Sequence, residues 1–437
     1  MRLRDSLSGE LRELMPGRDG VIGMYVCGPT VYSYIHVGNA RPYVVFGLMK
    51  RYLEWRGQRV RLVENITDVN DKIYDAANAA GEPSAPLAAR FAQAYLEDTD
   101  RLGIGRPDVE PLASETIPEI VALVETLIDA GLAYENSGDV YFRVRSFPDY
   151  GNVSHQRIEH LRQGARIEPG PLKEDPLDFA LWKATKPDED TSWESPWGKG
   201  RPGWHIECSA MAELHLGPQF ALHGGGRDLV FPHHENEYAQ SRGAGRPFAR
   251  VWAHNGMLTL ASEKMSKSLG NIERLRDALD REGAETLIML FLRAHYASPL
   301  DYGEETLAQA RATCDTIRNH FRTPAEARGG DASALRAAIE AALDEDFRTP
   351  EALAAIFAAD LRDGALRGVA AETLQVLGLG GLLEEEAAPA ELVELAERRE
   401  QARRRREFAA ADALREQIAA AGWEVRDTPR GPELYRA

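Results

Sequence analysis

Residues 21–63 read VIGMYVCGPTVYSYIHVGNARPYVVFGLMKRYLEWRGQRVRLV and predict a strand, a helix and a second strand in succession. Val21–Cys27 is a short apolar run, residues 39–56 carry apolar side chains at helical spacing, and Arg59–Val63 alternates as a strand does. This order is a parallel βαβ unit, so we expect an α/β fold built on a doubly wound parallel sheet. Ligands of such sheets bind at the carboxyl ends of the strands, where Cys27 and Glu64–Asp68 fall.

The rest of the chain extends this unit. We expect two helices and a hairpin between residues 85 and 145, an ordered insertion at 165–203, a return to the sheet from 204, and helices from 303 onward. Pro389 would stop a helix and marks a boundary near 388. The expected domains are therefore an α/β domain at 1–302 with an insertion at about 85–203, a helical bundle at 303–387 and a small domain at 388–437.

Composition limits the class of protein. The chain has 437 residues, of which 43% are hydrophobic and 28% charged, as in a soluble globular protein. No apolar run approaches the roughly 18 residues that span a bilayer, and no apolar signal segment follows Met1–Asp5, so we expect a cytoplasmic protein that does not enter a membrane. A net charge of −17 argues against nucleic-acid binding, although residues 391–437 are neutral and an acidic protein can carry a local basic face.

Two segments suit phosphate binding. His36-Val-Gly-Asn-Ala-Arg41 opens the first helix, where free N–H groups and the helix dipole attract anions and Gly38 admits a close approach. Glu263-Lys-Met-Ser-Lys-Ser-Leu-Gly-Asn271 places two lysines three residues apart, able to close over a polyphosphate. Each segment alone is equally consistent with a plain helix entry or a solvated lysine loop.

Four side chains form a candidate metal set. His233 and Glu237 are four residues apart at the start of a predicted helix, so they share one face. Cys27 lies at a strand end, and Cys208 follows Trp204-His-Ile-Glu207. Two thiolates, an imidazole and a carboxylate suit tetrahedral zinc, although a buried cysteine and a helix-capping histidine are common without a metal. The third cysteine, Cys314, lies in a helical run and is expected in the core.

The segment with Lys264 and Lys267 and the His36–Asn39 motif together resemble the signature of class I aminoacyl-tRNA synthetases. Four further segments resemble motifs of the cysteinyl-tRNA synthetase family: residues 24–32 (MYVCGPTVY), 65–73 (NITDVNDKI), 203–211 (GWHIECSAM) and 223–237 (HGGGRDLVFPHHENE). The resemblance runs from about residue 20 to the C-terminus. It implies a Rossmann-type catalytic domain with an inserted connective region and a helical C-terminal half.

The resemblance also implies roles for individual residues. His36, Gly38 and Asn39 would face ATP with Lys264 and Lys267, and magnesium would accompany the ATP. Thr67, Trp204, His223 and Asp228 would line the amino-acid and adenylate pocket. One zinc ion per chain would be held by Cys27, Cys208, His233 and Glu237. Three positions depart from the commonest family words: Asn39, Asn70 and Arg227.

The implied activity is ATP-dependent ligation of cysteine to tRNA(Cys) by a monomer, with zinc selecting the thiol. A shape-based pocket separates cysteine from serine by only about 1–3 kcal/mol, whereas zinc binds a thiolate in preference to a hydroxyl. The substrate sulfur would enter as a fifth ligand or displace one, such as Glu237. Two alternatives are a ligase that joins activated cysteine to a small amino sugar and an inactive paralogue that binds zinc or RNA.

The arginine-rich tail has two interpretations. Residues 398–406 contain six arginines and lie on a predicted helix that either pairs with its own glutamates or contacts the tRNA backbone near the anticodon. In the second case Trp423 and Arg426 would add base stacking and base contact.

Overall fold

The computed structural model describes residues 1–158, 172–260, 263–264, 273–384, 388–428 and 431–436. The chain divides into two compact units, residues 1–382 and 383–437. No helix in the described ranges is both long enough and apolar enough to cross a membrane.

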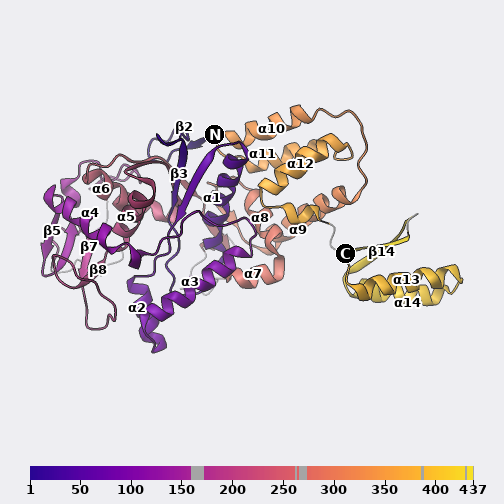
Figure 1. The fold of residues 1–437 in the computed structure, drawn as a ribbon, viewed down its shortest axis with the longest axis horizontal. Helices are drawn as coiled ribbons and strands as arrows, with labels where there is room; N and C mark the ends of the chain where they lie inside the picture. Colours follow the sequence, from indigo (N-terminus) through magenta and orange to yellow (C-terminus); the bar gives the residue numbers. More distant parts are fainter. Residues whose placement is uncertain (159–171, 261–262, 265–272, 385–387, 429–430, 437) are drawn as a thin grey trace. The chain divides into compact units, whose positions relative to one another are not determined.

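The centre of the first unit is a parallel sheet (Figure 1). Its strand order is β10-β9-β3-β4, and β3 (Val21–Val26) and β4 (Arg59–Glu64) are joined by helix α1 (Val37–Trp55). The other strands, β9 (Gln219–Gly226) and β10 (Phe248–Asn255), come from the segment after residue 204. The predicted βαβ unit and parallel sheet are confirmed, and the carboxyl ends of β3, β4 and β9 share one edge.

The insertion forms a second sheet. Phe179–Ala184 and Gly200–Pro202 are strands, although this region shows no clear period in the sequence. They extend the predicted hairpin into an antiparallel sheet of order β5-β6-β7-β8. The elements of this region are α2 (Asp71–Ala80), α3 (Ser84–Asp100), α4 (Ile117–Asp129), β5 (Ala133–Asn136), β6 (Asp139–Phe142), β7 (Phe179–Ala184) and β8 (Gly200–Pro202), followed by α5 (Trp204–Leu216).

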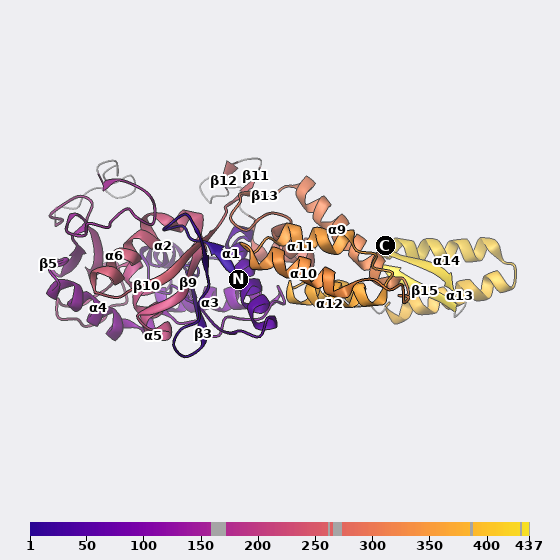
Figure 2. The ribbon, with the colours of Figure 1, turned by 90° about the horizontal axis from the view of Figure 1, so that it is seen from above.

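A helical region lies on the other side of the central sheet from the inserted strands, as both ribbon views show (Figure 2). Buried Cys314 packs in its helix α9, as predicted. The helices are α7 (Leu275–Glu282), α8 (Ala284–Leu292), α9 (Glu304–Arg322), α10 (Ala332–Asp344), α11 (Thr349–Ala358) and α12 (Gly364–Val376). The short strands β11 (Leu258–Leu260), β12 (Glu263–Lys264) and β13 (Leu300–Asp301) form a small separate sheet, and β1 (Arg2–Arg4) pairs with β2 (Leu11–Glu13).

The second unit is a helix pair with a hairpin. Helices α13 (Ala390–Arg404) and α14 (Phe408–Ala420) precede strands β14 (Trp423–Thr428) and β15 (Gly431–Arg436), which the sequence patterns did not predict. Trp423 is 6% exposed and packs in the core of this unit, so the expectation that it stacks on a base is wrong. Arg399 pairs with Asp427 at 2.7 Å, whereas Arg404 pairs with Glu400 of its own helix, as the first of the two interpretations expected.

Candidate active site and metal cluster

The carboxyl ends of β3 and β4 are pressed together at Gly28. A Cβ added to Gly28 would lie 1.8 Å from the carbonyl oxygen of Asn65, so only glycine permits this approach. The Gly28 N–H donates to Asn65 Oδ1 at 3.0 Å, and Asn65 Nδ2 donates to Thr67 Oγ1 at 3.1 Å. Cys208 on α5 contacts the same Oδ1 through its thiol at 3.6 Å. Asn65 thus joins Gly28, which follows Cys27, to Thr67 and Cys208 at one edge of the sheet.

The four side chains of the candidate metal set lie together. One ligand atom each from Cys27, Cys208, His233 and Glu237 falls within 4.8 Å of the others. Glu237 Oε1 on α6 (Glu235–Gly243) accepts from the Cys27 thiol at 3.4 Å and lies 3.2 Å from His233 Nε2. All four side chains are buried. The fold therefore brings the four predicted donors into one cluster.

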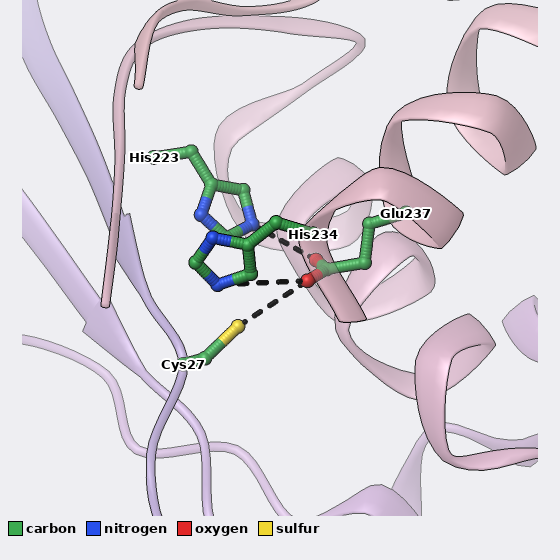
Figure 3. Close-up of side chains that lie close together, drawn as sticks. All are labelled: Cys27, His223, His234 and Glu237. Carbon is green, nitrogen blue, oxygen red and sulfur yellow. Dashed lines mark hydrogen bonds and ion pairs between the residues drawn. The ribbon is translucent and has the colours of Figure 1, made fainter. Parts of the chain in front are cut away.

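A second donor set overlaps the first. Figure 3 shows Cys27, His223 and His234 turned toward the carboxylate of Glu237, and one donor atom from each of these four residues lies within 4.8 Å of the others. His223 Nε2 lies 2.8 Å from Glu237 Oε2, and His234 Nε2 lies 4.0 Å from Oε1. His223, assigned to the substrate pocket by resemblance, is completely buried against a proposed metal ligand. His234 was not singled out from the sequence, because its neighbour His233 has the i, i+4 spacing to Glu237.

Further histidines hold these rings. His205 Nδ1 lies 2.8 Å from His233 Nδ1, and His254 Nε2 lies 2.7 Å from His234 Nδ1. In each pair one nitrogen must donate and the other accept, which requires neutral imidazole on the accepting side. Burial lowers the pKa of His205 and of His254 to about 3, so both are neutral at physiological pH. Sequence patterns missed both residues, since only the fold reveals which ring each one contacts.

The cluster has the chemistry of a cation site. Burial, the neighbouring Cys208 and Glu237 together raise the pKa of the Cys27 thiol well above its ordinary value. Burial likewise raises the pKa of Cys208 and lowers the pKa of His233. A bound dication reverses the preference of the thiols, because it deprotonates coordinating thiols, and it requires the neutral imidazole that burial already favours at His233. The residues present therefore fit a thiolate-binding metal.

The remaining predicted pocket residues are dispersed around the cluster. The Trp204 ring lies 4.2 Å from the His233 ring, centroid to centroid, at an interplanar angle of 35°. Thr67 is buried at the strand edge beside Asn65. Asp228 is exposed in the short helical turn Arg227–Leu229 that follows β9. Trp204 and Thr67 thus border the cluster, whereas Asp228 lies on the surface.

Three of the predicted nucleotide-binding residues, His36, Gly38 and Asn39, lie at the start of α1. Asn39 Oδ1 accepts from the His36 N–H at 3.2 Å, which closes the first turn of the helix. A Cβ on Gly38 would lie 2.9 Å from the His36 ring, so glycine lets that ring lie over the helix start. The backbone of Lys264 lies in β12 and pairs with Thr259 of β11. Lys267 lies outside the described residues.

Residues 13–312 match the family model described as the class I (C) tRNA synthetase catalytic domain. Over the full length, the chain is 45% identical to the cysteine–tRNA ligase of Rubrobacter xylanophilus, with 100% of this chain and 99% of the relative covered. It is 43% identical to that of Caldicellulosiruptor saccharolyticus, with both chains covered completely. The chain belongs to the cysteine–tRNA ligase family.

The fold is shared beyond this family. Mycobacterium tuberculosis methionyl-tRNA synthetase, solved with methionyl-adenylate, superposes with a TM-score of 0.59 over 83% of this chain and 90% of the other. At 17% identity this likeness shows the class I fold alone. The cysteine–tRNA ligase relatives, by contrast, match through the C-terminal unit as well, because their alignments cover this chain end to end.

Proposed function

We propose that the chain activates cysteine with ATP and transfers it to tRNA(Cys). The substrate carboxylate attacks the α-phosphate of ATP, pyrophosphate leaves, and a ribose hydroxyl of the terminal tRNA adenosine attacks the resulting mixed anhydride. Neither step needs a protein nucleophile, so catalysis rests on positioning and on stabilisation of phosphate charge. The observation that carries the proposal is the cluster of two buried thiols at the sheet edge where class I folds bind their substrates.

The ATP end of the site is assigned to the start of α1 and to the lysine segment. His36, Gly38 and Asn39 face the phosphates from the helix start, where the positive end of the helix dipole favours anions. Lys264 and Lys267 stabilise the charge that develops on the α-phosphate and on the departing pyrophosphate. Magnesium accompanies ATP as part of the substrate.

The amino-acid end is assigned to the metal cluster. We assign Cys27, Cys208, His233 and Glu237 as ligands of one zinc ion, with His205 orienting His233 through its Nδ1 atom. When bound, zinc supplies a soft Lewis acid that coordinates a thiolate far better than a hydroxyl. A preference for cysteine over serine of about 10⁴ corresponds to roughly 5.5 kcal/mol of differential binding. Thr67 and Trp204 complete the pocket beside the cluster, Asp228 is assigned to its solvent-exposed rim, and His223 supports the pocket by holding Glu237.

A second candidate function is ligation of activated cysteine to a small amino sugar. The second unit argues for tRNA instead, because the full-length relatives include it and its helix α13 carries several arginines. We further propose that the protein acts in the cytoplasm as a monomer, with its domains divided at about residues 302 and 387.

Pyrophosphate exchange separates these functions. The protein is incubated with ATP, labelled pyrophosphate and either cysteine or serine, and charging of total tRNA is then measured. Cysteine-dependent exchange with serine at least about 10³-fold less effective, followed by charging of tRNA(Cys), supports the proposal. No cysteine-dependent exchange would refute it, and exchange without charging of any tRNA would favour the amino-sugar ligase.

A further inference from the structure

Arg41 is a fully buried cation on the first turns of α1. Its guanidinium donates to four backbone carbonyl oxygens: those of Gly256 at 2.6 Å, Met257 at 3.3 Å, His295 at 3.4 Å and Ser298 at 2.8 Å. Within the described part of the chain no carboxylate forms an ion pair with it. Burial lowers its pKa to about 10, which still leaves the side chain charged at physiological pH.

The four carbonyls belong to two segments that the guanidinium joins. Gly256 and Met257 precede β11, whereas His295 and Ser298 precede β13, and β11 pairs with β13 in parallel. The two segments are in close contact, because a Cβ on Gly256 would lie 2.1 Å from the Ser298 carbonyl oxygen. A planar guanidinium holds its N–H donors in a fixed fork that spans both segments, whereas a lysine ammonium presents its three donors from a single compact point.

These two segments lead into the small sheet that contains Lys264, the lysine proposed to bind the ATP phosphates. β11 pairs with β12 in antiparallel register, with Thr259 opposite Lys264. Arg41 therefore connects α1 to the strand on which the backbone of Lys264 depends. Residues 273–275, which follow the lysine segment, return to the start of α1. The Val37 N–H donates to the Glu273 carbonyl at 3.1 Å, and the Leu275 N–H donates to the Ile35 carbonyl at 3.0 Å.

We propose that Arg41 is a positioning residue for adenylate formation: it sets the β11–β12 hairpin, and with it Lys264, against the helix start that carries His36 and Asn39. This inference rests on the proposed function, because it takes Lys264 as a ligand of the ATP phosphates. Arg41 itself contacts only backbone, so its effect on the reaction passes through the hairpin. A displacement of about 1 Å at a charge-stabilising group can cost about 10²-fold in rate.

Helix α1 supplies a matched control. Arg51 lies ten residues after Arg41 and also donates to backbone carbonyls, those of Ile104, Gln375 and Val376. Arg51→Lys therefore removes the same kind of fork from the same helix without touching the hairpin.

The experiment measures cysteine-dependent pyrophosphate exchange by the full chain carrying Arg41→Lys or Arg51→Lys. We expect Arg41→Lys to lower kcat about 10- to 100-fold while KM for cysteine stays within about twofold. Arg51→Lys is expected to leave both constants within about twofold. Equal losses in the two variants, or a loss in Arg41→Lys carried by KM for cysteine, would overturn the proposal.

A double-mutant cycle tests the route through Lys264. If Arg41 acts through this lysine, Arg41→Lys in a Lys264→Ala background lowers kcat by less than about threefold. An undiminished effect in that background contradicts the proposal.

Arg41→Gln, which keeps a donor without the charge, is the second variant. If neither Arg41 variant folds at 15 °C while Arg51→Lys does, Arg41 is structural and the proposal fails. Absence of exchange by the wild-type protein would instead refute the proposed function.

Discussion

Replacement of Glu64 by glutamine removes an acid that the fold buries at the end of β4. The side chain is 4% exposed, and its Oε1 accepts from the Tyr95 hydroxyl at 2.5 Å. Its Oε2 is buried without a hydrogen-bond partner among the described residues. Burial raises the pKa of Glu64 from 4.5 to about 8, although the Tyr95 hydrogen bond opposes that rise. Glutamine has the same shape and keeps an oxygen for Tyr95.

The sign of the pH dependence follows from the direction of this shift. Because the folded pKa lies above the unfolded one, the stability contributed by protonated Glu64 is complete below about pH 4.5 and is lost as pH rises toward 8. The loss approaches about 1.4 kcal/mol per pH unit inside this window. It amounts to about 3.5 kcal/mol between pH 5 and pH 8. Glu64→Gln is therefore expected to gain that much stability over the wild type across the same range.

The assay is urea unfolding of both proteins at pH 5, 6, 7 and 8, followed by tryptophan fluorescence. The difference in unfolding free energy between variant and wild type isolates Glu64, since titrations common to both proteins cancel. A difference that stays constant within about 0.5 kcal/mol from pH 5 to pH 8 would show that Glu64 titrates normally in the folded protein, and the reasoning from burial would be wrong.

Three further predictions use other parts of the chain. Asp71→Asn is expected to show the opposite pH dependence in the same assay. Burial alone would raise the pKa of Asp71, but ion pairs with Lys183 and Arg201 lower it to about 2. The variant should therefore be less stable than the wild type above pH 4 and equal to it near pH 2. Cys208→Ser should lower zinc content, measured by atomic absorption, and cysteine affinity, whereas the equally buried Cys314→Ser should change neither; full zinc occupancy in Cys208→Ser would contradict the ligand assignment. Trp423→Ala should destabilise residues 383–437 by about 3–5 kcal/mol and reduce tRNA charging with exchange kept within about twofold; unchanged charging would show that this unit's fold is not needed for transfer.

The central sheet could be predicted because its signals are local. The apolar run at 21–27 and the helical spacing at 39–56 each indicate their own element, and chain order then implies a parallel sheet. The terminal hairpin could not be predicted in the same way. Trp423–Thr428 follows two alanine-rich helices and is stabilised by its pairing with Gly431–Arg436, a contact that periodicity does not report.

The metal cluster was only partly predictable, for a related reason. The i, i+4 spacing of His233 and Glu237 is a local property of one helix, and it holds in the structure. The contacts of His223 and His254 join β9 and β10 to α6 and to the turn before it, so they depend on the packing of those elements. Such contacts have no sequence period, and resemblance to a family placed His223 in the pocket without showing that it bonds to Glu237.

Proximity alone does not choose between the two overlapping donor sets, since both share Cys27 and Glu237. What separates them is the other bond that each donor makes. His223 Nε2 lies within hydrogen-bond distance of Glu237 Oε2, and coordination through this nitrogen would break that contact.

His234 Nε2 lies 4.0 Å from Glu237 Oε1, whereas His233 Nε2 is at 3.2 Å. His233 and His234 each have Nδ1 held by a further histidine, His205 and His254 respectively, so the contact that fixes the tautomer does not separate the two sets. The set with Cys208 and His233 contains two thiolates, whereas the set with His223 and His234 contains one. Zinc prefers the softer, more sulfur-rich set. Metal binding by this set leaves His223 on the outer oxygen of Glu237, where it orients the carboxylate. His223→Gln is therefore expected to retain zinc but weaken its affinity about 10- to 100-fold, and complete loss of zinc would favour the alternative set.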